Sequence, residues 1–151
     1  MTTENLDKVI VALDPSDWHG YATETVWAEQ VSDNLYRIRN VPFYAKELSV
    51  EDIVLVEPRE GNYYFKFVSK RAGHSTYRIF LGENVSLEIF REYWKPLENI
   101  GCTYEKGQGR WFAIDVPAET DIHKAYNLLE AGERNSVWEF EEGHCGHPVN
   151  T

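Results

Sequence analysis

This sequence of 151 residues has few of the features that point to a special environment. Its two cysteines are too few for a disulfide framework and are typical of a protein from a reducing compartment. There is no apolar run of about 18 residues, so we expect no membrane-spanning segment. The N-terminal residues lack the basic flank and apolar stretch of a secretory signal. We therefore expect a cytoplasmic protein without membrane association.

Basic residues are also scarce. The chain has 15 Lys and Arg against 25 Asp and Glu, which gives a formal net charge of −10 at pH 7. Both halves share this excess, since residues 1–75 hold eight basic and twelve acidic residues and residues 76–151 hold seven and thirteen. Binding to phosphates depends on clustered cations, so the composition excludes nucleic acid as the direct partner.

No catalytic or metal-binding signature stands out. The soft metal ligands are concentrated in His144-Cys145-Gly146-His147, but zinc needs about four ligands and no second pair has suitable spacing. Cys102 follows a predicted helix whose electronegative C-terminal end disfavours a thiolate, so we interpret it as a buried structural thiol. We expect a protein that is not an enzyme and that has neither cofactor nor metal.

The first half of the chain has the pattern of short strands. β-branched and aromatic runs alternate with turn residues, and the intervals of two to five residues between several runs predict hairpins. Five close strands of this kind predict a small β-barrel or a curved antiparallel sheet over residues 8–75. The predicted strands are 8–13, 24–31, 35–40, 52–57 and 63–69.

In the second half of the chain, the apolar residues recur at a different spacing. Apolar residues at three- and four-residue steps predict two helices, one capped by Ser86 and one by Thr120. Pro96 should kink or end the first helix near Lys95, and Gly132 is expected to terminate the second. The remaining runs predict strands at 76–81, 102–106, 110–116 and 136–141.

The resulting order from residue 76 to residue 142 is β-α-β-β-α-β. This is the plan of a ferredoxin-like split βαβ unit, in which an antiparallel sheet has two helices on one face. The predicted fold class is therefore α+β, with a β-rich subdomain at 8–75 and a ferredoxin-like subdomain at 76–142. We expect residues 143–151 to form a loose tail.

Several short motifs, spread over residues 9–142, resemble a family of standalone bacterial domains of unknown function. The resemblance implies a complete protein rather than a fragment, and it attaches no catalytic role to any residue. The motifs are Glu24-Thr25-Val26-Trp27-Ala28, 36–45 (YRIRNVPFYA), Asp52-Ile53-Val54, 73–78 (GHSTYR), 97–105 (LENIGCTYE) and 113–117 (AIDVP).

One candidate ligand site is Gly73-His74-Ser75-Thr76-Tyr77-Arg78. Strand alternation places His74, Thr76 and Arg78 on one face, where an imidazole, a hydroxyl and a guanidinium could bind an anion or a small ligand. The competing interpretation is a solvated strand face, with His74 bonded to backbone. No acid partner is adjacent in the sequence.

A second candidate is a protein-binding surface made of carboxylates and aromatic rings. Carboxylates gather in two places and would attract a cationic partner, while aromatic side chains near loops would provide desolvated contacts. The competing interpretations are that the charge serves solubility and that the rings cover strand ends. The expected contact residues are Glu139, Glu141, Glu142, Glu47, Glu51, Asp52, Trp18, Tyr44 and Tyr64.

The sequence thus favours an acidic, non-enzymatic binding protein. Small size, a charge of −10 and the absence of a catalytic motif are typical of an immunity protein that neutralises a basic, nuclease-type toxin. The alternatives are a small-ligand-binding protein or an enzyme with a pocket around His74, Thr76 and Arg78, and a structural subunit of a larger assembly.

Overall fold

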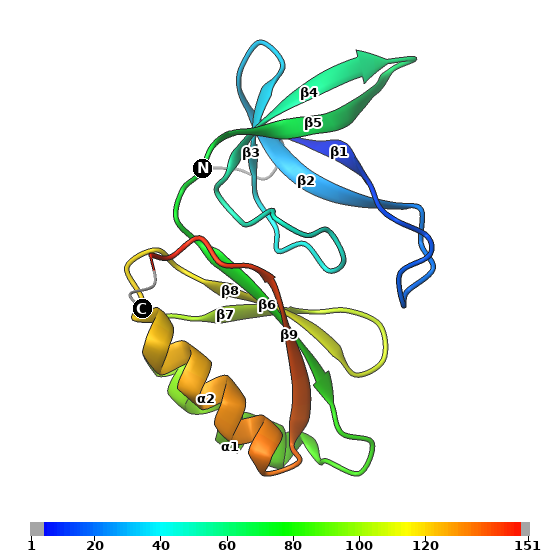
Figure 1. Cartoon of the computed structure of the whole chain (residues 1–151). Helices are drawn as coiled ribbons and strands as arrows, with labels where there is room; N and C mark the ends of the chain where they lie inside the picture. The colour runs from blue at the N-terminus through cyan, green and yellow to red at the C-terminus, as the bar shows by residue number, and fades with distance from the viewer. Residues whose placement is uncertain (1–4, 149–151) are drawn as a thin grey trace.

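The first half of the chain forms a five-stranded closed barrel. The computed structural model describes residues 5–148, and Figure 1 shows the barrel above a separate sheet that carries the helices. Neighbouring barrel strands are antiparallel except for the first and last, which pair in parallel and close the ring. The strands are β1 (Leu6–Ala12), β2 (Thr23–Ser32), β3 (Leu35–Ile38), β4 (Ile53–Arg59) and β5 (Asn62–Lys70).

Strand alternation explains the barrel interior. Small and β-branched side chains at every second position point inward, where they surround Tyr36. A two-residue turn joins β2 to β3, and Asn34 adopts the left-handed conformation that Asn tolerates, with φ of 60°. The predicted barrel and this predicted hairpin are both confirmed. The buried strand residues are Val9, Val11, Val26, Ala28, Tyr36, Ile38, Val54 and Val56.

The second half has the predicted β-α-β-β-α-β order. Its four strands form an antiparallel sheet in the order β7-β8-β6-β9, and both helices cover one face (Figure 1). None of the helices in the described part of the chain is long and apolar enough to cross a membrane. The elements are β6 (Ser75–Leu81), α1 (Leu87–Asn99), β7 (Thr103–Lys106), β8 (Trp111–Val116), α2 (Ile122–Arg134) and β9 (Trp138–His144).

The two halves have separate apolar cores and a polar junction. One core fills the barrel, and the other lies between the sheet and its helices, around Phe90, Leu97 and Trp138. At the junction, the sheet face opposite the helices meets the barrel loop 40–49. There the Ser49 and Thr76 hydroxyls share a hydrogen bond of 2.6 Å. The halves therefore share no apolar core and are joined by hydrogen bonds and by ring contacts such as that of Tyr44 with Trp111.

Three predicted details of the helices are wrong: an end of the first helix near Lys95, Thr120 as the cap of the second, and Gly132 as its terminator. Helix α1 continues through Pro96 to Asn99, because Pro96 lies on the exposed face and the Glu92 carbonyl that it leaves without a donor is on the same face. The N-cap of α2 is Asp121, whose carboxylate accepts from two backbone N–H groups. Thr120 instead donates its hydroxyl to the Ile100 carbonyl, at 2.8 Å.

The C-terminal residues are packed where the sequence predicted a loose tail. Strand β9 extends to His144, and His147 is buried. The His147 ring donates from Nε2 to the Pro117 carbonyl at 2.8 Å, so its Nδ1 accepts from the Ser75 hydroxyl at 2.6 Å. These bonds are between residues far apart in sequence, which explains why local composition missed them. Residues 149–151 of the predicted tail lie outside the described residues.

Gly132 has a packing role instead of the predicted terminating role. It lies inside α2, which continues to Arg134, and a Cβ at this position would lie 2.2 Å from an indole carbon of Trp138. That indole donates from Nε1 to the Leu129 carbonyl at 2.8 Å. The absent side chain therefore lets Trp138 pack directly on the helix backbone.

This packing predicts that Gly132→Ala destabilises the protein, although Gly to Ala normally stabilises a helix interior by roughly 0.5–1 kcal/mol. The added methyl group should displace the indole, and we expect the free energy of unfolding to fall by about 1–3 kcal/mol. Denaturant unfolding measures the change, with the exposed Asn127→Ala on the same helix as a control. A stabilised Gly132→Ala protein would contradict this account.

Candidate functional site

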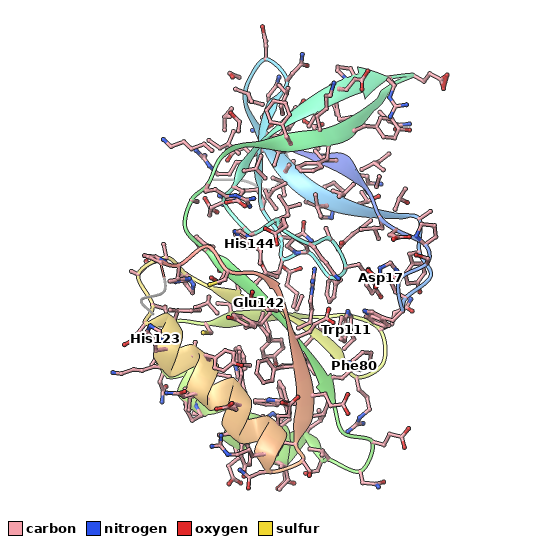
Figure 2. The ribbon with its side chains drawn as sticks, in the orientation of Figure 1. Asp17, Phe80, Trp111, His123, Glu142 and His144 are labelled. Atoms are coloured by element: carbon pink, nitrogen blue, oxygen red, sulfur yellow. The ribbon has the colours of Figure 1, made fainter. Side chains whose placement is uncertain are left out.

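An exposed aromatic cluster lies at the junction between the barrel and the sheet. We define it by six rings, three of which are about half exposed: Trp18 at 54%, Tyr21 at 49% and Phe80 at 42%. Trp18 connects the loop after β1 to the sheet, because its ring centroid lies 5.5 Å from Phe80 and 5.1 Å from Trp111. Figure 2 shows Phe80 and Trp111 together on one side of the molecule, with Asp17 nearby. The six rings are Trp18, His19, Tyr21, Tyr44, Phe80 and Trp111.

The loop that carries Tyr44 is held from two sides. The Glu24 carboxylate accepts hydrogen bonds from the backbone N–H groups of Phe43, Tyr44 and Ala45, at 2.5, 2.9 and 2.8 Å. From the sheet side, the fully buried Arg78 guanidinium donates to the carbonyls of Pro42 and Ala45. These bonds fix the loop backbone and therefore the position of the Tyr44 ring.

The Arg78 side chain reaches this loop by passing close to Gly143 of β9. A Cβ at Gly143 would lie 2.4 Å from the Arg78 Nη1 atom, so the guanidinium packs against bare backbone. Burial lowers the pKa of Arg78. The Glu141 carboxylate, which lies 3.7 Å from Nη1, raises this pKa but does not offset the effect of burial. Arginine remains charged in proteins, so Arg78 and Glu141 form an ion pair at the edge of the junction.

Tyr44 and Trp111 form the centre of the aromatic cluster. Their rings are nearly parallel, with an interplanar angle of 15° and centroids 6.2 Å apart. Burial raises the pKa of the Tyr44 phenol, and Tyr21 and Glu24 raise it further, so the hydroxyl stays protonated at neutral pH. The indole N–H of Trp111 is buried and has no hydrogen-bond partner within residues 5–148.

A hollow of about 350 Å³ opens beside these two rings, and we call it the aromatic hollow. Four of its lining residues are aromatic and four have polar or charged side chains other than aromatic ones, which is the mixture of apolar area and polar groups typical of a binding site. Its lining residues are Tyr21, Thr23, Glu24, Thr25, Phe43, Tyr44, Gly107, Gln108 and Trp111.

A second hollow, of about 750 Å³, lies at the open end of the sheet, and we call it the acidic hollow. Three carboxylates line it, from Glu83, Glu133 and Glu139, and no Lys or Arg is among its described lining residues. A small hollow of about 80 Å³ shares Phe80 and Glu139 with it and shares Trp111 with the aromatic hollow. The aromatic cluster and the carboxylates thus form one continuous surface.

The structure brings together four of the nine predicted partner-contact residues. Trp18 and Tyr44 belong to the aromatic cluster, and Glu139 and Glu141 lie on the adjacent face of β9. Glu142 does not join them, because strand alternation turns it to the helix side, where it accepts from the Tyr77 hydroxyl at 3.0 Å.

The other four predicted contact residues lie elsewhere. Glu51 pairs with Arg39 at 2.8 Å, and Glu47 is exposed on the loop beside His144. Tyr64 is on β5 of the barrel, where its ring packs under Arg59 at 4.0 Å. Asp52 is buried with 1% exposure and accepts from the Ser49 and Ala72 backbone and from Arg71. The prediction that Asp52 attracts a partner is therefore wrong, since its carboxylate organises the junction.

The alternative site at His74, Thr76 and Arg78 does not open into one shared hollow of those described above, because Arg78 alone of the three lines one, the small hollow of about 80 Å³. Thr76 and Arg78 share a sheet face as predicted, but both are fully buried against the barrel loop, so the competing solvated-face interpretation is wrong. His74 donates from Nδ1 to the Asp115 carboxylate at 2.8 Å. Within residues 5–148, His74 lines none of the hollows described above.

The soft metal ligands near the C-terminus do not converge. His144 faces Glu47 and Arg71, whereas His147 bonds to Ser75. Among residues 5–148, no group of three or more His, Cys, Asp or Glu side chains is placed to hold a metal ion. Cys102 is a buried free thiol, and burial raises its pKa to about 12, which suits the structural role predicted for it.

Sequence reasoning missed several residues of this surface, and three of them show why. Phe80, Trp111 and Glu24 come from three different strands, and nothing local shows that they meet. Phe80 did carry a signal, because alternation along β6 puts this large ring on the same face as Thr76 and Arg78. An aromatic ring on a polar strand face is a candidate for an exposed contact.

Comparison with known proteins adds a family and a fold. Residues 24–140 match a family described as "Domain of unknown function (DUF4265)". A solved structure titled "Novel crystal structure of a hypothetical protein from Neisseria gonorrhoeae" is similar, with a TM-score of 0.81 and 18% identity over 93% of this chain and 96% of that one. At this identity the likeness shows the fold alone. No curated protein matched the sequence.

The contact between His74 and Asp115 predicts a pH-dependent contribution to stability. The hydrogen bond to Asp115 raises the pKa of His74 above its ordinary value of 6.5, although burial opposes this. A raised pKa in the folded state stabilises the protein fully below the unfolded value, and this gain is lost as pH rises through the folded value.

We therefore expect His74→Gln to lower the free energy of unfolding more at about pH 5.5 than at about pH 8.5. Denaturant unfolding at both pH values tests this, with the exposed His123→Gln on α2 as the control. An effect of His74→Gln that is equal at both pH values, or larger at the higher one, would show that the ion pair does not stabilise the fold.

Proposed function

We propose that this chain, which belongs to the DUF4265 family of domains of unknown function, is a non-enzymatic binding protein for a basic protein. One observation supports this above all: half-exposed aromatic rings adjoin a hollow lined by three carboxylates and, among its described residues, by no cation. The rings provide area that a partner can desolvate, and the carboxylates provide a field that selects a cationic partner.

The aromatic cluster has the character of an interface centre. Tryptophan and tyrosine dominate the binding energy of many interfaces because they combine a large apolar area with few rotatable bonds. The Tyr44 ring is already fixed by the Glu24 and Arg78 contacts of its loop, so little conformational entropy is lost when a partner binds.

The acidic hollow makes this surface negatively charged. Glu83 and Glu139 take part in no ion pair within the described residues, and the nearby Arg110 guanidinium donates to backbone carbonyls rather than to either carboxylate. Together with the net charge of −10, these two carboxylates favour fast encounter with a basic partner at low ionic strength.

The most specific form of the proposal is an immunity protein that neutralises a basic, nuclease-type toxin. Such a protein acts by covering its target, so a contact surface is sufficient and catalytic residues are not required. An acidic surface would compete for the cationic groups with which a nuclease holds phosphates. What supports this form is the combination of charge and aromatic area, together with a surface held rigidly by its neighbours.

The experiment begins with capture of bound proteins from the native host on immobilised protein. Association kinetics with the identified partner are then measured from about 50 to about 500 mM salt. We expect the double variant Glu83→Lys and Glu139→Lys to slow association by about tenfold at low salt and to flatten its salt dependence.

The matched control is the double variant Glu92→Lys and Glu119→Lys, which makes the same change in net charge at exposed positions away from the acidic hollow. We expect this control to behave nearly like the wild type. Equal effects of both variants would show that only total charge matters. Association of the wild type that is independent of salt would refute the proposal.

A further inference from the structure

We infer that the aromatic hollow holds an arginine side chain of the basic partner, an inference that rests on the proposed function. The rings of Tyr21, which is half exposed, and of Tyr44, which is partly buried, line this hollow, and the buried Trp111 ring packs nearly parallel to Tyr44. A guanidinium is planar and stacks on aromatic rings, whose negative faces attract its charge. The ammonium group of lysine has no such plane, so the geometry selects arginine over lysine.

The polar groups around the hollow suit the hydrogen-bonding needs of a guanidinium. Arginine has five N–H donors and no acceptor, so its partners must be acceptors. Thr23, Thr25 and Gln108, whose side chains each have an acceptor oxygen, line the hollow together with Glu24. Glu24 already accepts three backbone N–H groups, and a carboxylate has about four acceptor positions, so one position is left for a ligand.

The local charge also favours a cationic occupant. Glu24 carries a negative charge into the lining, and no Lys or Arg lines this hollow among the described residues. The Arg78 guanidinium behind the loop is buried and is balanced by Glu141. A carboxylate ligand would therefore meet repulsion from Glu24 without finding a partner cation, whereas a guanidinium would gain an ion pair.

The acidic hollow lies next to this proposed arginine site. It adjoins the aromatic hollow through Trp111 and Phe80, so a basic segment that follows the carboxylates comes close to the Tyr21 and Tyr44 rings. In this arrangement the acidic hollow contributes mainly to the rate of association, and the arginine contributes to the lifetime of the complex.

The test uses the full chain and two small probes, acetyl-Gly-Arg-Gly-amide and the same peptide with citrulline, which is neutral but has nearly the shape of arginine. NMR titration follows the indole N–H signal of Trp111. We expect the arginine peptide to shift this signal with a millimolar Kd, and we expect citrulline to bind about tenfold more weakly.

Variants locate the site. Tyr21→Ala removes an exposed ring from the edge of the aromatic hollow and should weaken binding of the arginine peptide by about fivefold. Tyr126→Ala is the matched control, since Tyr126 is a ring of similar exposure, 42%, on α2. We expect it to leave the Kd unchanged. Thermal unfolding of both variants checks that the fold is kept.

Several outcomes would overturn the inference. They are equal binding of arginine and citrulline, an unchanged Kd in Tyr21→Ala, and no shift of the Trp111 signal up to about 20 mM peptide. Shifts confined to Glu83, Glu133 and Glu139 would overturn it and leave the proposed function standing. Specific binding of the arginine peptide, combined with salt-independent association of the protein partner, would refute the proposed function alone.

Discussion

The buried guanidinium of Arg78 is the contact on which the arrangement of this molecule depends. The barrel and the sheet each have an apolar core of their own, so burial of these two cores stabilises each half without fixing one against the other. Arg78 crosses between them by donating to two carbonyls of the barrel loop while its other side faces Glu141. Hydrogen bonds have strict distances and angles, so this contact sets the relative position of the halves more sharply than apolar packing would.

The candidate binding surface is a consequence of that junction. Tyr44 lies on the barrel loop, Trp111 and Phe80 lie on the sheet, and Trp18 lies on the loop after β1. These rings meet only because the halves are held in one orientation. The Glu24 carboxylate acts on the same loop from the barrel side, so the backbone beside Tyr44 is restrained in both directions. Polar contacts that hold the fold together therefore also assemble the surface proposed to bind a partner.

The order of elements could be read from the sequence because it depends on local periodicity. Strand alternation and helical spacing are properties of neighbouring residues, and they predicted both the barrel and the β-α-β-β-α-β unit. The errors occurred where tertiary contacts decide. Pro96 is tolerated because its face is exposed, Gly132 is required by Trp138, and the C-terminal segment is fixed by Ser75 and Pro117.

Residues of the candidate site were only partly predictable for the same reason. Glu139 and Glu141 stood out by charge, and Trp18 and Tyr44 by residue type. Composition alone did not separate them from Asp52, which has the same charge but lies inside the junction. Glu24 contacts the Tyr44 loop, and His74 contacts Asp115, because of the register of the strands that carry them. Residue type alone does not reveal this register.

The parallel pairing of β1 with β5 has a consequence for how another chain could attach. The pairing joins Val9 to Tyr63 and Ile10 to Tyr64, so among the described residues every barrel strand has a neighbouring strand on each side. The four-stranded sheet is open, and its outer strands are β7 and β9. These two strands are therefore the outer edges along which a partner could extend the sheet, and of them β9 carries Glu139 and Glu141.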